Sequence, residues 1–231
     1  MAAASPGMAE ASTADCPPLL LVLDLREPLP GSVRAELAAS LAPLERQRWQ
    51  ALRLEADQER FLRGRGALRR LVGAWRGEPP EAVPIGAGAH GKPCCAGGPE
   101  FNLSHSGDLI LLALHGQRPV GVDVEQRRPG LAWRPIARRV LPPAEWQALE
   151  ARWPPLEMGA GAMDATAAAA AAEAERQGAE AFLAAWCRLE ARLKAQGLGL
   201  AGLQQAEAAV EVWEVAVPIG YRAALALAPA P

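Results

Sequence analysis

The stretch 101–125 constrains the fold of this chain more than any other part of its sequence. It contains two apolar runs of strand length, 109–115 and 119–125, which predict a β-hairpin. Asp123 and Glu125 lie two residues apart at the end of the second run, so their side chains are expected on one face. Two carboxylates on one face of an apolar strand repel each other and usually need a cation or a strong donor between them. This segment is therefore expected to form a site.

A second polar cluster, Ser104 and His105, directly precedes the first run. Adjacent residues of an extended segment point in opposite directions, which argues against a nucleophilic serine–histidine pair. His105 is better suited to donate to an anion, and the alternative for a single histidine is a satisfied structural role.

The remaining sequence predicts a mixture of helices and strands. The expected elements are a buried strand at 19–24, a short helix through Ser40 capped by Ser32, two helices over 43–76 that break near 56–57, a helix over 179–196, and apolar strands at 210–217 and 222–228. Residues 157–178 include six consecutive alanines and show no apolar face, so we expect a mobile or partly helical insertion there.

Arginine is unevenly distributed along the chain. Residues 44–76 hold nine arginines against four acidic residues, which favours recognition of phosphate oxygens, with a solvated helix face as the alternative. Gly64 and Gly66 within this region indicate close approach of another backbone or a ligand. A second basic patch comprises Arg127, Arg128, Arg134, Arg138 and Arg139. The net charge of −2 argues against general nucleic-acid binding.

The chain length of 231 residues fits one large domain or two small domains packed together. Four cysteines without CxxC spacing are expected to be reduced thiols of a cytosolic protein. Residues 1–15 lack the basic residues and the long apolar run of a signal peptide, and no stretch approaches membrane-spanning length. The sequence thus predicts a soluble cytoplasmic protein with a disordered tail over 1–17.

The helix expected over 179–196 carries Glu190 and Lys194 one turn apart, on one flank of its apolar stripe. An ordinary ion pair between them is the simplest interpretation. If this helix packs beside the second apolar run, however, Glu190 joins Asp123 and Glu125. Three carboxylates with waters and substrate phosphates form the kind of site that Mg²⁺ prefers.

Three motifs resemble the signatures of the Sfp-type 4′-phosphopantetheinyl transferases. They are Phe101-Asn102-Leu103-Ser104-His105-Ser106, Gly121-Val122-Asp123-Val124-Glu125 and Trp186-x-x-Leu189-Glu190-x-x-x-Lys194-x-x-Gly197-x-Gly199-Leu200. Two lesser matches, Arg60-Phe61-Leu62-x-Gly64-Arg65-x-x-Leu68-Arg69 and Gly91-Lys92-Pro93, lie upstream. All five occur in the family's order over most of the chain, from about Leu19 to Leu227, which makes the resemblance specific.

The resemblance implies an α+β fold with a pseudo-two-fold repeat of two similar halves, 18–119 and 120–228, and coenzyme A bound between them. It implies a holo-[acyl-carrier-protein] synthase activity, in which 4′-phosphopantetheine moves from coenzyme A to a serine of an apo carrier protein and 3′,5′-ADP is released. The carrier would be acyl, polyketide or peptidyl, as in fatty-acid, polyketide or nonribosomal peptide biosynthesis. We expect a monomer that binds neither nucleic acid nor membrane.

The same resemblance assigns roles to individual residues. Mg²⁺ would be held by Asp123, Glu125 and Glu190. The catalytic residues would be Glu190 as general base, Lys194 as the group that assists the leaving phosphate, and His105. The groups that bind coenzyme A would be Arg48, Arg60, Lys92, Ser104, His105 and Lys194.

Two positions depart from the family pattern. Leu189 stands where the family often has lysine, and Glu45 stands where some relatives carry a basic residue. Leu189 is expected to keep the packing of the apolar stripe while losing a charge. It also favours an alternative function, a homologue that binds coenzyme A or a carrier protein without transfer.

Overall fold

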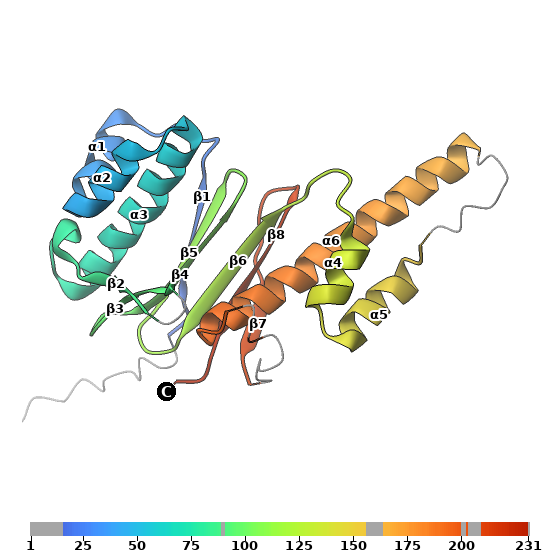
Figure 1. The fold of residues 1–231 in the computed structure, drawn as a ribbon. Coiled ribbons are helices and arrows are strands. Elements are labelled where there is room, and N and C mark those ends of the chain that lie inside the picture. Colours follow the sequence, from blue (N-terminus) through green and yellow to red (C-terminus); the bar gives the residue numbers. More distant parts are fainter. Residues whose placement is uncertain (1–15, 89–90, 156–163, 200–201, 203–208, 231) are drawn as a thin grey trace, which may run out of the picture.

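The structure, a computed structural model, describes residues 16–88, 91–155, 164–199, 202 and 209–230. It is a mixed helix-and-strand fold with two three-stranded antiparallel sheets, ordered β1-β5-β4 and β6-β8-β7. Helices cover the outer face of each sheet, and the two sheets lie next to each other in the middle (Figure 1). The predicted α+β class is therefore confirmed.

The first sheet contains β1 (Leu19–Asp24), β4 (Glu100–Ser106) and β5 (Leu109–His115), with β5 in the centre. It is covered by α3 (Glu55–Arg76), which α1 (Gly31–Ala39) and α2 (Pro43–Ala51) flank (Figure 1). One 3-10 turn (Pro80–Ala82) and a small hairpin of β2 (Ile85–Ala87) and β3 (Pro93–Cys95) complete this half.

Two glycines let α3 lie close to its neighbours, as the sequence predicted. A Cβ at Gly64 would lie 3.2 Å from Leu103 Cδ1 on β4, and one at Gly66 would lie 2.9 Å from Leu37 Cβ on α1. Buried apolar side chains then fill the space between α3 and the sheet, among them Leu68, Val72 and Leu112.

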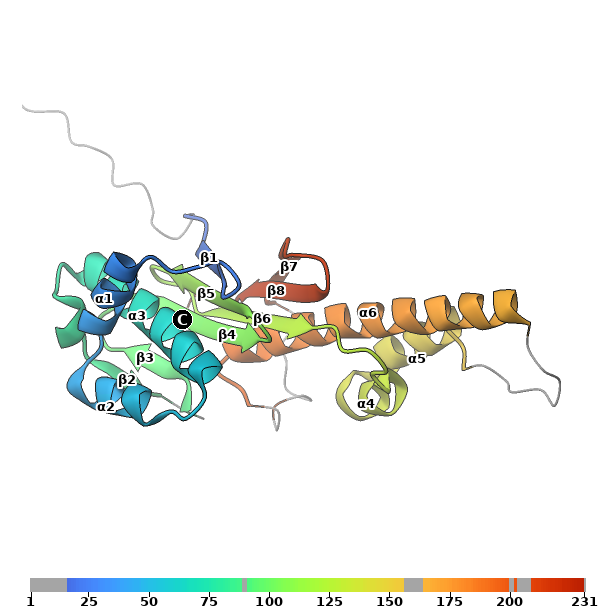
Figure 2. The ribbon, with the colours of Figure 1, turned by 90° about the horizontal axis from the view of Figure 1, so that it is seen from above.

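The second sheet contains β6 (Val120–Gln126), β7 (Glu211–Glu214) and β8 (Tyr221–Leu227), with β8 in the centre. The long helix α6 (Ala165–Ala195) crosses it, and α4 (Trp133–Val140) and α5 (Pro143–Arg152) pack against α6 (Figures 1 and 2). A Cβ at Gly121 would collide with the carbonyl oxygen of Ala191, so β6 and α6 touch backbone to backbone.

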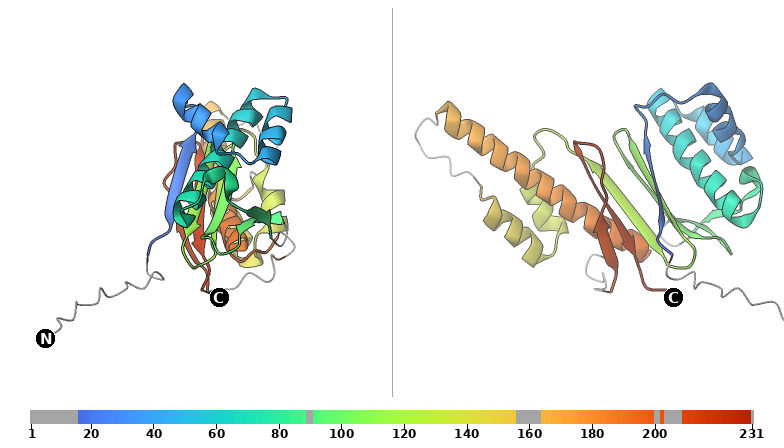
Figure 3. Two further views of the ribbon diagram at one scale, coloured as in Figure 1. Left: turned by 90° about the vertical axis from the view of Figure 1, so that its left-hand side faces the viewer. Right: turned by 180° about the vertical axis from the view of Figure 1, so that it is seen from behind.

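The two sheets share one topology. In each sheet, the strand that comes first in the sequence (β1 or β6) lies at one edge and is followed by helices. Two further strands then complete the sheet, and the last of them (β5 or β8) lies in its centre. Every strand of the first sheet precedes residue 116 and every strand of the second follows residue 119. The view from behind in Figure 3 shows the same succession of helices, sheet, sheet and helix.

The predicted hairpin between 109–115 and 119–125 is wrong. These runs are β5 and β6, but β5 pairs with β1 and β4, while β6 pairs with β8. The chain changes sheets between them, and their apolar faces pack on each other: Leu109, Leu111 and Ala113 of β5 share a core with β6 and β8. The segment 100–106, expected only to precede a strand, is itself β4 and forms the hairpin with β5.

Several boundaries also differ from expectation. The break between α2 and α3 lies at 52–54, and Pro30 rather than Ser32 precedes α1. The strand at 19–24 has the predicted bounds but is only partly buried, because it forms the edge of its sheet. The strands expected at 210–217 and 222–228 are present with somewhat different ends, as β7 and β8.

Most of the predicted insertion is helical, as the expectation of a partly helical segment allowed, but it is largely exposed apart from Ala171 and Gly178. Residues 165–178 form the first part of α6, begun by the side chain of Asp164, which accepts a hydrogen bond from the Ala167 amide. A Cβ at Gly178 would lie 2.7 Å from the Trp133 ring, so this part of the helix contacts α4 closely. Residues 157–163 lie outside the described residues, as does most of the predicted tail, 1–15.

All four cysteines are free, in agreement with the prediction. In the part of the chain that the structure describes, no helix has both the length and the apolarity needed to cross a membrane.

Candidate active site

The site begins with the alternation of side chains along β4. Asn102, Ser104 and Ser106 point toward β6, whereas His105 points to the other face, toward α3. The Asn102 Oδ1 accepts a hydrogen bond from the Val122 amide at 2.9 Å. The Ser104 hydroxyl donates to Asp123 Oδ1 at 2.9 Å, and the Ser106 hydroxyl donates to Glu125 Oε2 at 2.9 Å.

Residues 102, 104 and 106 of β4 contact residues 122, 123 and 125 of β6 in that order, so the two strands run parallel. Within the described ranges, β4 and β6 are not joined by backbone pairing. Side chains of one strand therefore replace the backbone ladder that would normally join two neighbouring strands.

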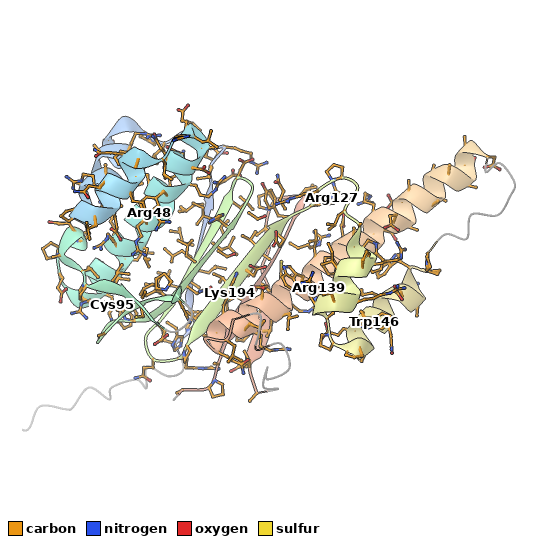
Figure 4. The ribbon with its side chains drawn as sticks, in the orientation of Figure 1. Arg48, Cys95, Arg127, Arg139, Trp146 and Lys194 are labelled. Atoms are coloured by element: carbon orange, nitrogen blue, oxygen red, sulfur yellow. The ribbon has the colours of Figure 1, made fainter. Side chains whose placement is uncertain are left out.

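The second half of the site comes from α6. Gly121, Asp123 and Glu125 alternate on the face of β6 that α6 covers, and the close contact at Gly121 brings the helix down onto this face. Lys194 Nζ then lies 2.5 Å from Asp123 Oδ1, 3.3 Å from Ser104 Oγ and 3.6 Å from Glu190 Oε2. Figure 4 shows Lys194 at the middle of the molecule, where α6 meets β6.

Glu125 and Glu190 are both partly buried. Burial raises the pKa of each carboxyl above its usual range, and the negative charge of Asp123 raises both further. The Ser106 hydroxyl opposes this rise at Glu125, and the Lys194 ammonium opposes it at Glu190. The site thus holds a group of carboxylates that favours an added positive charge.

On the other face of β4, α2, α3 and β4 enclose a cavity of about 400 Å³. Its lining includes Arg48, Arg60, Phe61 and His105. The Arg48 guanidinium lies 5.5 Å from the centroid of the Phe61 ring, and Arg60 Nη1 lies 2.6 Å from Asp57 Oδ1.

His105 lies at the rim of this cavity. Loss of surrounding water, followed by the positive charges of Arg60 and Lys194, holds the pKa of its imidazole below the usual value. An anion in the cavity would oppose both charge effects, so the cavity is suited to a phosphate group.

Lys92 and Ser104 do not join this cavity group. Lys92 Nζ donates to the carbonyl oxygens of Lys194 at 2.9 Å and Val120 at 3.2 Å, and burial lowers its pKa. Both residues lie where the two sheets meet. The predicted set for coenzyme A is therefore divided: Arg48, Arg60 and His105 gather around the cavity, while Lys92, Ser104 and Lys194 gather at the carboxylates.

Many of the other arginines of 44–76 have structural partners. Glu45 pairs with both Arg65 and Arg69, and Arg69 also donates to the carbonyl oxygens of Pro80 and Val83. Glu45, the departure noted above, thus holds α2 against α3. Among the described residues Arg48 makes no salt bridge, which leaves its charge available to the cavity.

The second basic patch is also largely paired. Arg127, Arg134 and Arg138 form salt bridges with Glu180, Glu175 and Glu150 respectively. Arg139 lies on α4, beside the helix that carries Trp146 (Figure 4). Among the described residues Arg128 and Arg139 form no salt bridge, so only part of the charge of this patch is neutralised within the protein.

The sequence did not assign a role to Asn102 or Ser106. The signal was present in the motif, since polar residues recur at every second position from 102 to 106 and predict one polar face of a strand. It was missed because this segment was not expected to be a strand.

The side chains of this site can be compared with the ligands that Mg²⁺ prefers. As placed, no three acidic, histidine or cysteine side chains within the described ranges lie close enough to hold a metal ion. The donor set still has the chemistry that Mg²⁺ selects, because it offers three carboxylates and Asp123 Oδ2 is buried without a hydrogen-bond partner. Asp123, Glu125 and Glu190 therefore fit this ion by chemistry.

The fold and the site define an enzyme with carboxylates and a lysine on one side of a strand and an arginine–histidine cavity on the other. Residues 119–218 match the family described as ACPS, the 4′-phosphopantetheinyl transferase superfamily. The chain is 31% identical to the 4′-phosphopantetheinyl transferase HetI of Nostoc sp. over 192 residues, which cover 81% of this chain and 72% of HetI.

Further relatives agree with this match. The 4′-phosphopantetheinyl transferase AcpT of Escherichia coli K12 is 33% identical over 175 residues, 72% of this chain and 71% of AcpT. A phosphopantetheinyl transferase of Thraustochytrium sp. is 38% identical over a shorter range, 40% of this chain and 34% of that protein. The chain belongs to the 4′-phosphopantetheinyl transferase superfamily and is a transferase.

Proposed function

We propose that this enzyme transfers 4′-phosphopantetheine from coenzyme A to a serine of an apo acyl, polyketide or peptidyl carrier protein, releases 3′,5′-ADP and depends on Mg²⁺. The single observation that carries the proposal is the position of Lys194, which lies between Asp123 and Glu190 and close to Ser104 of β4. Residues from both halves thereby meet at one point beside a cavity suited to phosphate.

Arg48, Arg60 and His105 would bind the 3′-phosphate of coenzyme A in the cavity of about 400 Å³. Arginine matches phosphate oxygens with a planar pair of donors, and His105 gains a proton more readily once an anion faces it. Lys92 and Lys194 would lie toward the pyrophosphate, where two amines offset its charge.

The reaction requires positioning and charge neutralisation more than covalent help. The carrier serine hydroxyl attacks the β-phosphorus of coenzyme A, the bond from that phosphorus to the bridging oxygen breaks, and 3′,5′-ADP leaves with the electron pair. Glu190 would take the serine proton, for which its raised pKa suits it. Lys194 would offset charge on the departing phosphate.

Asp123, Glu125 and Glu190 would hold Mg²⁺, which when bound neutralises pyrophosphate charge and favours departure of the leaving group. Asp123 would contribute Oδ2, the oxygen without a hydrogen-bond partner among the described residues. Glu125 contributes a carboxylate whose ionised form is disfavoured without an added positive charge.

The binding-only alternative rested on Leu189. This side chain is buried in the core that α4 and α6 share, with Trp133 and Phe182. Leucine at this position therefore serves packing and leaves the carboxylates and Lys194 in place, which favours the transferase.

We further propose that the protein is a monomer whose two halves, 18–119 and 120–228, are related by a pseudo-two-fold axis.

The test is to incubate the protein with coenzyme A, Mg²⁺ and several apo carrier proteins and to weigh the carriers by mass spectrometry. The proposal predicts a mass gain equal to one phosphopantetheine group, and none when Mg²⁺ is removed with EDTA. The matched control is a carrier whose acceptor serine is replaced by alanine. Carriers that all keep their apo mass, while coenzyme A still binds, would support the binding-only alternative.

A further inference from the structure

The seam between the two sheets is made by side chains that also contact the carboxylates. We propose that Ser104 and Ser106 are positioning residues, whose hydroxyls orient Asp123 and Glu125 for the transfer reaction. This inference rests on the proposed function and deepens it, because it gives Ser104 a role other than contact with the nucleotide.

The first argument is that the direction of each hydroxyl proton is fixed. A serine hydroxyl has one proton and two lone pairs. The Ser106 oxygen accepts a hydrogen bond from the Gln126 amide at 3.1 Å, so its proton is left to Glu125 Oε2 at 2.9 Å. The Ser104 oxygen likewise accepts from Lys194 Nζ at 3.3 Å and gives its proton to Asp123 Oδ1.

The second argument is the match of spacing. Ser104 and Ser106 are two residues apart on β4, as Asp123 and Glu125 are on β6, and both strands repeat every two residues. Each serine therefore meets one carboxylate without any bend in either strand. Ser104 and Ser106 are themselves buried, so water does not replace these hydrogen bonds.

The third argument is what lies on the other face of the same strand. His105, between the two serines, faces the cavity proposed for the 3′-phosphate. One strand thus holds the nucleotide on one face and the carboxylates on the other. The serines therefore contact the carboxylates from the face of β4 that is opposite to the cavity.

The experiment compares Ser104→Ala and Ser106→Ala with Tyr221→Phe. The Tyr221 hydroxyl accepts a hydrogen bond from the Asp108 amide at 3.1 Å, so it also joins the two sheets, but among the described residues it makes no hydrogen bond to a carboxylate. For each protein we would measure the thermal midpoint, the binding of 3′,5′-ADP by calorimetry without metal, and kcat and KM for coenzyme A in carrier modification.

We expect kcat to fall on the order of tenfold in both serine variants, as loss of a hydrogen bond to a charged group predicts. KM and the affinity for 3′,5′-ADP should stay within about twofold, because neither hydroxyl faces the cavity. Tyr221→Phe should lower the thermal midpoint as much as the serine variants do while keeping kcat within about twofold.

Two results would overturn the inference. Weakened 3′,5′-ADP binding by Ser104→Ala with unchanged kcat would make Ser104 a nucleotide ligand. If all three variants lost kcat in proportion to the fall in their thermal midpoints, the contacts between the two sheets would have only a structural role. Failure of the proposed function is distinct, because it would appear in the wild-type protein as an unmodified carrier and would overturn both proposals.

Discussion

At the scale of a single residue, the proposed role of Glu190 as general base is the one that a substitution tests most directly. We expect Glu190→Gln to lower the transfer rate by about 10²-fold or more, since the amide cannot accept the serine proton. Coenzyme A binding should largely persist, because Glu190 lies away from the arginine–histidine cavity. Single-turnover carrier modification and calorimetry measure the two quantities separately, and a variant with full activity would remove Glu190 from the role of base.

His105 should make nucleotide binding depend on pH. Its pKa is held below the usual value of about 6.5 by partial loss of surrounding water and by the positive charges of Arg60 and Lys194. An anion favours the protonated imidazole, so the affinity for 3′,5′-ADP should rise as the pH falls toward and through the pKa of the free protein. Calorimetry between about pH 5 and 8 measures this.

A His105→Ala variant serves as the control for that titration. It should bind 3′,5′-ADP more weakly and show a flatter dependence on pH, since the imidazole that gains a proton when the anion binds has been removed. If the variant kept the slope of the wild-type protein, the dependence would belong to another group, such as the nucleotide phosphate itself.

At the scale of elements, the contact between α6 and β6 decides whether the two ends of the site meet. A Cβ at Gly121 would collide with backbone atoms of Ala191 and Ala195, which cannot move without displacing the helix that carries Lys194. We expect Gly121→Ala to lower the free energy of unfolding by about 3 kcal/mol or more. Urea denaturation measures this, and circular dichroism would detect a variant that does not fold.

Gly64→Ala is the matched control for this substitution. The new Cβ would meet the end of the Leu103 side chain at 3.2 Å, and alanine is favoured over glycine within a helix by roughly 1 kcal/mol. The free energy of unfolding should therefore change by less than about 1 kcal/mol. Equal effects at both glycines would show that backbone contact at Gly121 is not limiting.

The sequence predicted which segments form strands and helices better than it predicted which strands pair with each other. The apolar runs that form β1, β5 and β8 were found because they have strand length and clear ends. The pairing of β5 with β6 was wrongly predicted, since closeness in sequence favours a hairpin and nothing local shows that the chain changes sheets between 115 and 120. The helical part of 157–178 agrees with the expected partly helical insertion, but its continuity with the helix expected over 179–196 was not predicted, because alanine lacks the apolar pattern that marks a packed face.

The sequence predicted most residues of the candidate site but not how they are arranged in space. The spacing of Asp123 with Glu125 and of Glu190 with Lys194 predicted that each pair would share a face. Whether the pairs meet depends on Gly121, whose packing role the sequence did not show. The division of the coenzyme A set also needed the structure, since it follows from β4 being a strand with two different faces.

At the scale of the whole molecule, the two sheets depend on each other for the burial of their inner faces. Leu109 and Leu111 of the first sheet and Val122 and Leu225 of the second belong to one buried apolar cluster, so neither sheet alone would bury its inner face. Lys92 and the serines of β4 add polar contacts at the same boundary. This dependence explains why residues that lie 90 positions apart, such as Ser104 and Lys194, are in direct contact.

In the part of the chain that the structure describes, the loop 116–119 is the one connection between a strand of the first sheet and a strand of the second. A protein cut there would keep every strand of each sheet in one fragment, and the shared apolar faces would drive the fragments together. We expect co-expressed fragments to modify a carrier and either fragment alone to leave it unmodified. Phosphopantetheine transfer would then report that the two fragments had associated through the core that the sheets share.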